Sequence, residues 1–210
     1  MKDNFNVAVI GAGYWGKKVI NEYLQLAKEN GNVDLSMVCD VKDENLTYCR
    51  DKFGVSEEKL KPSYEEVLSS NNVDAVHICT PNETHHEICK QALLAGKHVL
   101  LEKPMAMRAK HAWELVGLAE HNGLILQVGH IFRFNNALKT VRDLVAQNYF
   151  GTLYYLKLQW TTLMSSPFLD SFAREFVLLV LLHLRVTVCL RCGKHRSERA
   201  PQVHHTRKGT

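Results

Sequence analysis

The sequence predicts an α/β fold, a doubly wound parallel sheet that is followed by the start of an incomplete α+β second domain. Short apolar runs alternate with amphipathic helical stretches between residues 7 and 129, an order typical of parallel sheets with right-handed crossovers. The first apolar run leads straight into a Gly-x-Gly-x-x-Gly turn. Glycines or polar residues also follow the later runs, at the strand ends where ligands of such sheets bind.

The first strand is expected over Val7–Ile10, four apolar residues of the kind buried inside a parallel sheet. Gly11, Gly13 and Gly16 follow it, and a helix is expected from about Lys17 to Lys28. In this context the first glycine permits a tight turn, the second admits a pyrophosphate to the backbone, and the third lets the helix lie close on the strand. The free N–H groups of the helix start attract phosphate. We therefore predict a Rossmann-type dinucleotide site, with a glycine-rich turn that binds nothing as the alternative.

Asp40 ends the second expected strand, Val33–Cys39, and lies 24 residues after Gly16. A carboxylate at this strand end accepts hydrogen bonds from the hydroxyls of an adenosine ribose and repels a 2′-phosphate. We therefore predict NAD rather than NADP as the cofactor. The alternative role of Asp40 is a solvated strand end or a cap for the helix that follows.

The remaining elements continue the alternation as far as residue 129. Helices are expected near residues 44–53, 64–69, 83–95 and 108–121, and strands over residues 73–79, 98–101 and 124–128. The three strands end at Thr80-Pro81-Asn82, Glu102-Lys103-Pro104 and Gly129-His130. Since the carboxyl ends of parallel strands share one edge of the sheet, these residues are expected near the glycine turn. A helix over 136–147 and a strand over 153–162 then open a second, sheet-based domain.

The composition is that of a soluble globular protein, with 46% hydrophobic and 23% charged residues among 210. The net charge of +4 comes from residues 166–210, which carry 8 Lys+Arg against 3 Asp+Glu, whereas residues 1–165 carry 18 against 19. This balance gives no reason to expect a nucleic acid as partner. No signal peptide is expected before the first strand, and the six cysteines are expected to be reduced thiols. We therefore expect a cytoplasmic protein.

Two features near the C-terminus suggest a membrane span or a metal site but meet the requirements of neither. Phe176–Leu190 is apolar but only 15 residues long, whereas a membrane helix needs about 20. Cys189 and Cys192, with His195 nearby, have a partial zinc-ligand spacing. A zinc site needs four well-placed ligands, and nothing else in this stretch is typical of a zinc fold. We predict no metal and no membrane partner.

Four motifs, taken together, resemble the Gfo/Idh/MocA oxidoreductase family. They are the Gly11–Gly16 turn with the aromatic pair Tyr14-Trp15, Cys79-Thr80-Pro81-Asn82-Glu83-Thr84-His85, Glu102-Lys103-Pro104, and Gly129-His130-Ile131-Phe132-Arg133-Phe134. The resemblance covers residues 5–165. Within the family, the run 129–143 and the strand that ends at Thr162 are most similar to archaeal UDP-N-acetylglucosamine 3-dehydrogenases.

The resemblance implies an enzyme that moves a hydride between nicotinamide and the hydroxyl-bearing carbon of a sugar or nucleotide sugar, with C3 of UDP-N-acetylglucosamine as a candidate. It implies that Lys103 is catalytic, since an ammonium beside the nicotinamide hydrogen-bonds the alcohol and stabilises a developing alkoxide. It implies cofactor contacts from Gly11, Gly13, Tyr14, Trp15, Gly16, Asp40, Thr80, Pro81, Asn82, His85, Glu102 and Lys103. Arg133 and Asn135 would meet the sugar or diphosphate of the substrate. The residues alone leave blander roles open, with Lys103 an ordinary exposed lysine and His85 a plain surface residue.

The sequence departs from the family pattern after residue 165. Family members carry an Asp-x-x-x-His pair in the second domain, whereas here Asp170 is followed by Arg174. Residue usage also changes, since residues 1–165 hold 13 Asn and 6 Ile and residues 166–210 hold neither. We expect a dinucleotide-binding domain over 1–130, a hinge and the first elements of a truncated substrate domain over 131–165, and an aberrant, frameshifted tail over 166–210.

The altered tail sets the expectation for function. We expect an NAD-dependent sugar or UDP-sugar dehydrogenase that is impaired in this form, and an NAD-binding module without turnover is the alternative. Members of the family associate through the sheet of the second domain, so the homo-oligomer of the family is not carried over to this chain.

Overall fold

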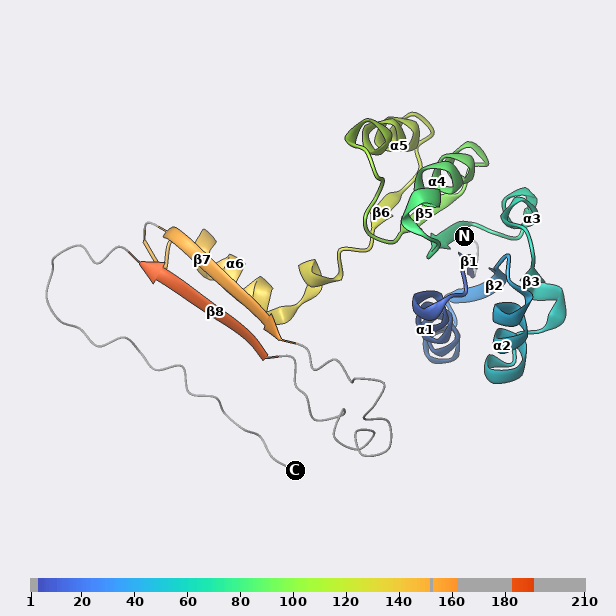
Figure 1. The fold of residues 1–210 in the computed structure, drawn as a ribbon, viewed down its shortest axis with the longest axis horizontal. Coiled ribbons are helices and arrows are strands. Elements are labelled where there is room, and N and C mark those ends of the chain that lie inside the picture. The colour runs from blue at the N-terminus through green and yellow to red at the C-terminus, as the bar shows by residue number, and fades with distance from the viewer. Residues whose placement is uncertain (1–3, 152, 162–182, 191–210) are drawn as a thin grey trace, which may run out of the picture. The chain divides into compact units, whose positions relative to one another are not determined.

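The computed structural model describes residues 4–151, 153–161 and 183–190 and divides the chain into two compact units, Met1–His130 and Ile131–Thr210 (Figure 1). The strands of the first unit are β1 (Phe5–Ile10), β2 (Val33–Cys39), β3 (Leu60–Lys61), β4 (Ala75–Ile78), β5 (His98–Leu101) and β6 (Leu126–Val128). Its helices are α1 (Tyr14–Asn30), α2 (Asp43–Phe53), α3 (Tyr64–Ser69), α4 (His85–Leu94) and α5 (Ala109–His121), with short 3-10 turns η1 (Glu57–Lys59) and η2 (Asn82–Thr84).

A six-stranded sheet in the order β3-β2-β1-β4-β5-β6 forms the centre of the first unit. Every neighbouring pair of strands is parallel. From β1 the chain proceeds to β2 and β3 on one side and then crosses to β4, β5 and β6 on the other. The carboxyl ends of β1 and β4 therefore flank the point at which the strand order reverses, where ligands of such sheets bind. The doubly wound parallel sheet predicted from the sequence is confirmed.

Helices cover the sheet from both sides, as two successive residues of β1 illustrate. Ile10 belongs to a core that includes Leu93 of α4. Its neighbour Val9 belongs to a second core, with Ile20 of α1 and Leu46 of α2. Consecutive residues of a strand point to opposite faces, so burying both Val9 and Ile10 requires a helical layer on each side of the sheet.

The turn between β1 and α1 brings backbone segments too close together for side chains. A Cβ atom on Gly16 would lie 1.8 Å from the carbonyl oxygen of Gly11. Gly11 itself has a φ of +96°, and its own Cβ would lie 2.8 Å from the carbonyl group of Cys79. Glycine at these two positions lets α1 lie against the end of β1 and lets the turn approach the end of β4.

The second unit contains the 3-10 turn η3 (Ile131–Phe134), the helix α6 (Asn136–Ala146) and the antiparallel strands β7 (Leu153–Thr161) and β8 (His183–Leu190). Asn135 caps the start of α6, because its side-chain oxygen accepts hydrogen bonds from the N–H groups of Ala137 and Leu138 at 3.0 and 3.3 Å. Strand β8 was not predicted from the sequence, which indicated only the strand that became β7.

Several features expected near the C-terminus lie outside the described residues. Among them are Asp170, Arg174, Cys192 and His195. In the described part of the chain, no helix combines the length and the apolar character that a membrane crossing requires. Nor does any cluster of His, Cys, Asp or Glu side chains among the described residues have an arrangement that could hold a metal ion.

Replacing Gly16 with alanine is expected to lower the free energy of unfolding by about 1 to 3 kcal/mol, because the new methyl group forces the Gly11 carbonyl or α1 to move. The measurement is urea denaturation followed by circular dichroism. Gly117→Ala is the matched control, since a Cβ at this position in α5 meets nothing within 4 Å and alanine favours a helix over glycine by about 0.5–1 kcal/mol. Equal unfolding midpoints for the two variants would contradict the steric account.

Candidate cofactor-binding site

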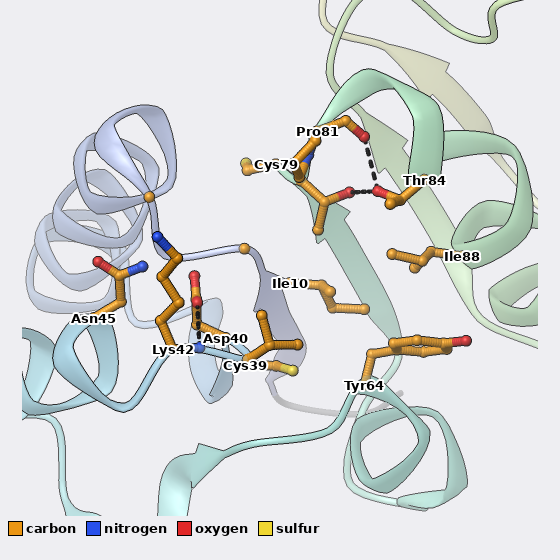
Figure 2. A pocket seen from close by; sticks show the side chains of 14 residues that line it. Ile10, Cys39, Asp40, Lys42, Asn45, Tyr64, Cys79, Pro81, Thr84 and Ile88 are labelled. Atoms are coloured by element: carbon orange, nitrogen blue, oxygen red, sulfur yellow. Dashed lines mark hydrogen bonds between the residues drawn. The ribbon is translucent and has the colours of Figure 1, made fainter.

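A pocket of about 530 Å³ opens at the carboxyl ends of β1, β2 and β4. Figure 2 shows Asp40 and Lys42 on one side of it and Pro81 and Thr84 on the other, with Ile10 between them. The residues that line it are Ile10, Gly11, Gly13, Cys39, Asp40, Val41, Lys42, Asn45, Tyr64, Cys79, Thr80, Pro81, Thr84 and Ile88. Five of the residues predicted to contact a cofactor, Gly11, Gly13, Asp40, Thr80 and Pro81, are therefore brought together in one pocket.

Asp40 ties the glycine turn to the end of β2. Its Oδ2 accepts a hydrogen bond from the N–H of Ala12 at 2.7 Å, and its Oδ1 accepts one from the N–H of Lys42 at 2.9 Å. The carboxylate thus anchors two backbone segments, a role that differs from the solvated strand end or helix cap left open as alternatives by the sequence. Each oxygen of an ionised carboxylate has a second acceptor site, so the side chain can also receive a ligand hydroxyl.

The start of α1 leaves space for a ligand. A Cβ atom on Gly13 would meet nothing within 4 Å, and no side chain caps the helix at this residue. The N–H groups of an uncapped first turn attract anions. Tyr14 and Trp15 do not line the pocket. The two residues are 80% and 39% exposed, and the ammonium of Lys18 lies 4.4 Å from the centre of the Tyr14 ring.

The segment after β4 is held by hydrogen bonds among its own residues. The hydroxyl of Thr84 lies 2.8 Å from that of Thr80 and 2.7 Å from the carbonyl oxygen of Pro81, so it can donate to either (Figure 2). Asn82 is exposed at the start of η2. His85, the first residue of α4, is completely buried, so the alternative reading of this histidine as a plain surface residue is wrong.

The imidazole of His85 bridges the two segments that follow β4 and β5. Its Nε2 lies 2.9 Å from the carbonyl oxygen of Thr80, and its Nδ1 lies 2.7 Å from the carbonyl oxygen of Pro104. Lys103 precedes Pro104 through a cis peptide bond, and its side chain is exposed. The lysine predicted to be catalytic is thus free to meet a ligand, while the residue that follows it is held.

A partly buried chain of polar side chains holds the residue before Lys103. Nε2 of His77 lies 3.4 Å from Oε1 of Glu102, and the Tyr23 hydroxyl lies 3.3 Å from Nδ1 of the same ring. Burial lowers the pKa of His77, against the opposing effect of the Glu102 carboxylate, and burial raises the pKa of Tyr23 to about 12. A neutral ring satisfies both contacts if Tyr23 donates to Nδ1 and Nε2–H donates to Glu102.

The two residues predicted to contact the substrate, Arg133 and Asn135, both belong to the second unit. Arg133 is exposed in η3, and the side chain of Asn135 is the N-cap of α6. Their contact with the sugar or diphosphate of a substrate stays a prediction.

Sequence reasoning missed many of the residues that line the pocket. Those not predicted are Ile10, Cys39, Val41, Lys42, Asn45, Tyr64, Cys79, Thr84 and Ile88. Val41 and Lys42 directly follow Asp40, so their position next to a predicted cofactor contact could have identified them as pocket residues. Tyr64 and Ile88 come from α3 and α4, and only the packing of these helices on the sheet brings them to the pocket.

The sequence of this chain is similar to a known family and to several known proteins. A family model described as an oxidoreductase family with an NAD-binding Rossmann fold matches residues 5–130. An uncharacterized oxidoreductase of Synechocystis is 36% identical over 163 residues, which are 75% of this chain and 41% of the relative. The UDP-N-acetylglucosamine 3-dehydrogenase of Acidithiobacillus ferrooxidans is 31% identical over 154 residues, or 73% of this chain and 44% of the relative.

Among solved structures, the scyllo-inositol dehydrogenase of Lactobacillus casei with bound NAD(H) and scyllo-inositol is similar in fold. It has a TM-score of 0.67 and 22% sequence identity, and the match covers 75% of this chain and 45% of that one. In all three cases the chain spans less than half the length of the relative.

The depressed pKa of His77 predicts how stability changes with pH. An unfolded chain binds a proton at this ring below about pH 6.5, whereas the folded chain does not until a lower pH. The free energy of unfolding should therefore fall as the pH drops below about 6.5, by up to about 1.4 kcal/mol per pH unit from this group. Denaturation of the wild type and of His77→Gln between about pH 7 and pH 5 isolates the contribution. Parallel stability curves for the two proteins would show that His77 is not the source.

Proposed function

The chain belongs to the Gfo/Idh/MocA family of oxidoreductases, and we propose that it binds NAD in the pocket at the ends of β1, β2 and β4. The observation that carries this proposal is the open turn at Gly13 beside the carboxylate of Asp40, at the reversal point of the strand order. The residues present fit a dinucleotide. Gly13 and the start of α1 would hold the pyrophosphate, and Asp40 would accept hydrogen bonds from the adenosine ribose.

The nicotinamide half would be held by the segments after β4 and β5. Thr80 and Pro81 line the pocket, and Lys103 is exposed on the neighbouring segment. Bound NAD supplies the acceptor for a hydride. When a sugar alcohol is oxidised, its carbon gives the hydride to NAD and its hydroxyl gives a proton to solvent water, since an ammonium has no lone pair to accept it. The ammonium of Lys103 would hydrogen-bond this oxygen and stabilise the negative charge that develops on it.

For the substrate, we propose a sugar or nucleotide sugar, with C3 of UDP-N-acetylglucosamine as the candidate position. The similarity to the dehydrogenase of Acidithiobacillus ferrooxidans supports this choice. Arg133 is a candidate for a diphosphate contact, since a guanidinium binds phosphate oxygens in pairs. The second candidate function is an NAD-binding module without turnover, which is favoured by Arg174 in place of the family's second-domain histidine.

The role proposed for Asp40 can be tested through cofactor preference. Because its carboxylate repels a 2′-phosphate, the wild type should bind NADH more tightly than NADPH, and Asp40→Asn should reduce this preference by about tenfold or more. The amide oxygen of asparagine can still accept one of the two backbone hydrogen bonds, which favours a folded variant. Fluorescence titration with each reduced cofactor gives the two dissociation constants. An unchanged preference for NADH over NADPH in the variant would show that Asp40 does not determine which cofactor binds.

Turnover distinguishes the two candidate functions. If the chain is a dehydrogenase, adding UDP-N-acetylglucosamine and NAD should produce NADH, and Lys103→Ala should slow this reaction by about 100-fold or more. Lys110→Ala, at an exposed lysine of α5, is the matched control and should keep the wild-type rate. Tight NADH binding with no NADH formation would favour the module without turnover. A Lys103→Ala variant with the wild-type rate would contradict the catalytic role.

A further inference from the structure

His85 connects two segments that the sheet itself leaves unconnected. The pairing of β4 with β5 ends at Ile78 and Leu101, and the last backbone hydrogen bond beside it runs from the N–H of Glu102 to the carbonyl of Ile78. Beyond this point the chain passes into the segments around Thr80 and Lys103. The imidazole of His85 lies between them and contacts a carbonyl oxygen on each, at 2.9 and 2.7 Å.

Because His85 is buried, its side chain can hold backbone groups but cannot itself contact a ligand. The residue is 0% exposed, and both of its ring nitrogens already face backbone carbonyl oxygens. A neutral imidazole has one N–H and donates to one of these oxygens, whereas the doubly protonated ring donates to both. In either form the side chain has no nitrogen left for a cofactor, although the family resemblance implied a cofactor contact for it.

The segment around Lys103 is therefore held on both sides of the lysine. Pro104 is held through its carbonyl oxygen by His85. Glu102 is held through its carboxylate, which lies 3.4 Å from His77 and would lie 3.0 Å from a Cβ on Gly129. The residues before and after Lys103 are thus held by buried histidines, and the lysine projects from between them.

We propose that His85 is a positioning residue for the nicotinamide half of the site, acting through the carbonyl groups of Thr80 and Pro104. The inference rests on the dinucleotide binding proposed above. By holding these two carbonyl groups, His85 fixes the spacing between Thr80, in the wall of the pocket, and the backbone from which the Lys103 side chain projects. The adenosine half, formed by the glycine turn and Asp40, lies outside its reach because that half is held by separate hydrogen bonds.

Binding of NADH and of ADP-ribose to the full chain tests whether His85 acts on the nicotinamide half of the site and not on the adenosine half. ADP-ribose contains the adenosine, pyrophosphate and second ribose but lacks the nicotinamide. His85→Phe removes both ring nitrogens and should weaken NADH binding by about tenfold, while His85→Gln keeps an N–H donor and should weaken it by about threefold. Both variants should bind ADP-ribose as the wild type does. His86→Phe is the matched control, because this neighbouring histidine contacts His111 and Glu114 instead.

Each outcome of the binding experiment has one meaning. Selective loss of NADH affinity in the two His85 variants, with no change in His86→Phe, supports the proposal. Wild-type NADH affinity in His85→Phe overturns it, and so does an equal loss of NADH and ADP-ribose affinity, which would indicate a general structural effect. A wild type that binds neither ligand would instead overturn the proposed dinucleotide site, and this inference with it.

Circular dichroism shows whether the variants fold. Should both His85 variants fail to fold, nitrogen-15 NMR of histidine-labelled wild type still tests the contact. A ring N–H of His85 that exchanges slowly with water, with a coupling across the hydrogen bond to a backbone carbonyl, supports the bridge. A ring without any protected N–H overturns it.

Discussion

The close contact between Gly16 and Gly11 is the constraint on which the rest of the site depends. With hydrogen in place of a side chain at both residues, α1 can start directly beside the end of β1. The same turn touches the backbone of Cys79, so the end of β4 lies beside it. Three chain segments thereby meet at the reversal point of the sheet. The pocket forms here because the strands continue into segments that diverge while their starting points are held together.

Beyond the ends of the strands, side chains replace the hydrogen-bond ladder of the sheet. Asp40 holds the turn after β1 against the end of β2, and His85 holds the segment after β4 against the segment after β5. His77 holds Glu102 from within the sheet. In each case a side chain fixes a loop beyond the end of a strand, and of these three residues only Asp40 also lines the pocket. Such support leaves the backbone and the exposed Lys103 available to a ligand, while the path of the backbone is set before binding.

The sequence predicted the elements whose signals are local. The apolar strands and the glycine turn were found because burial and tight turns require particular residue types at short spacing. β3 was missed because two residues carry no periodicity, and α1 begins at Tyr14 rather than Lys17. The role of His85 was also inaccessible. Its partners are backbone carbonyl groups, which every residue has, so no residue type marks the positions that the ring will bridge.

The interior place of β1 also affects how the chain is synthesised and folds. Val7 pairs with Leu35 of β2 on one side and with Ala75 of β4 on the other, and Ala75 is synthesised after Leu35. When only the first half of this unit has left the ribosome, β1 has one edge of unpaired backbone N–H and C=O groups, because β4 has not yet been made. An edge of this kind is a template for pairing with other chains. The strand at the centre of the finished site can therefore pair with other chains during translation, until β4 has been synthesised.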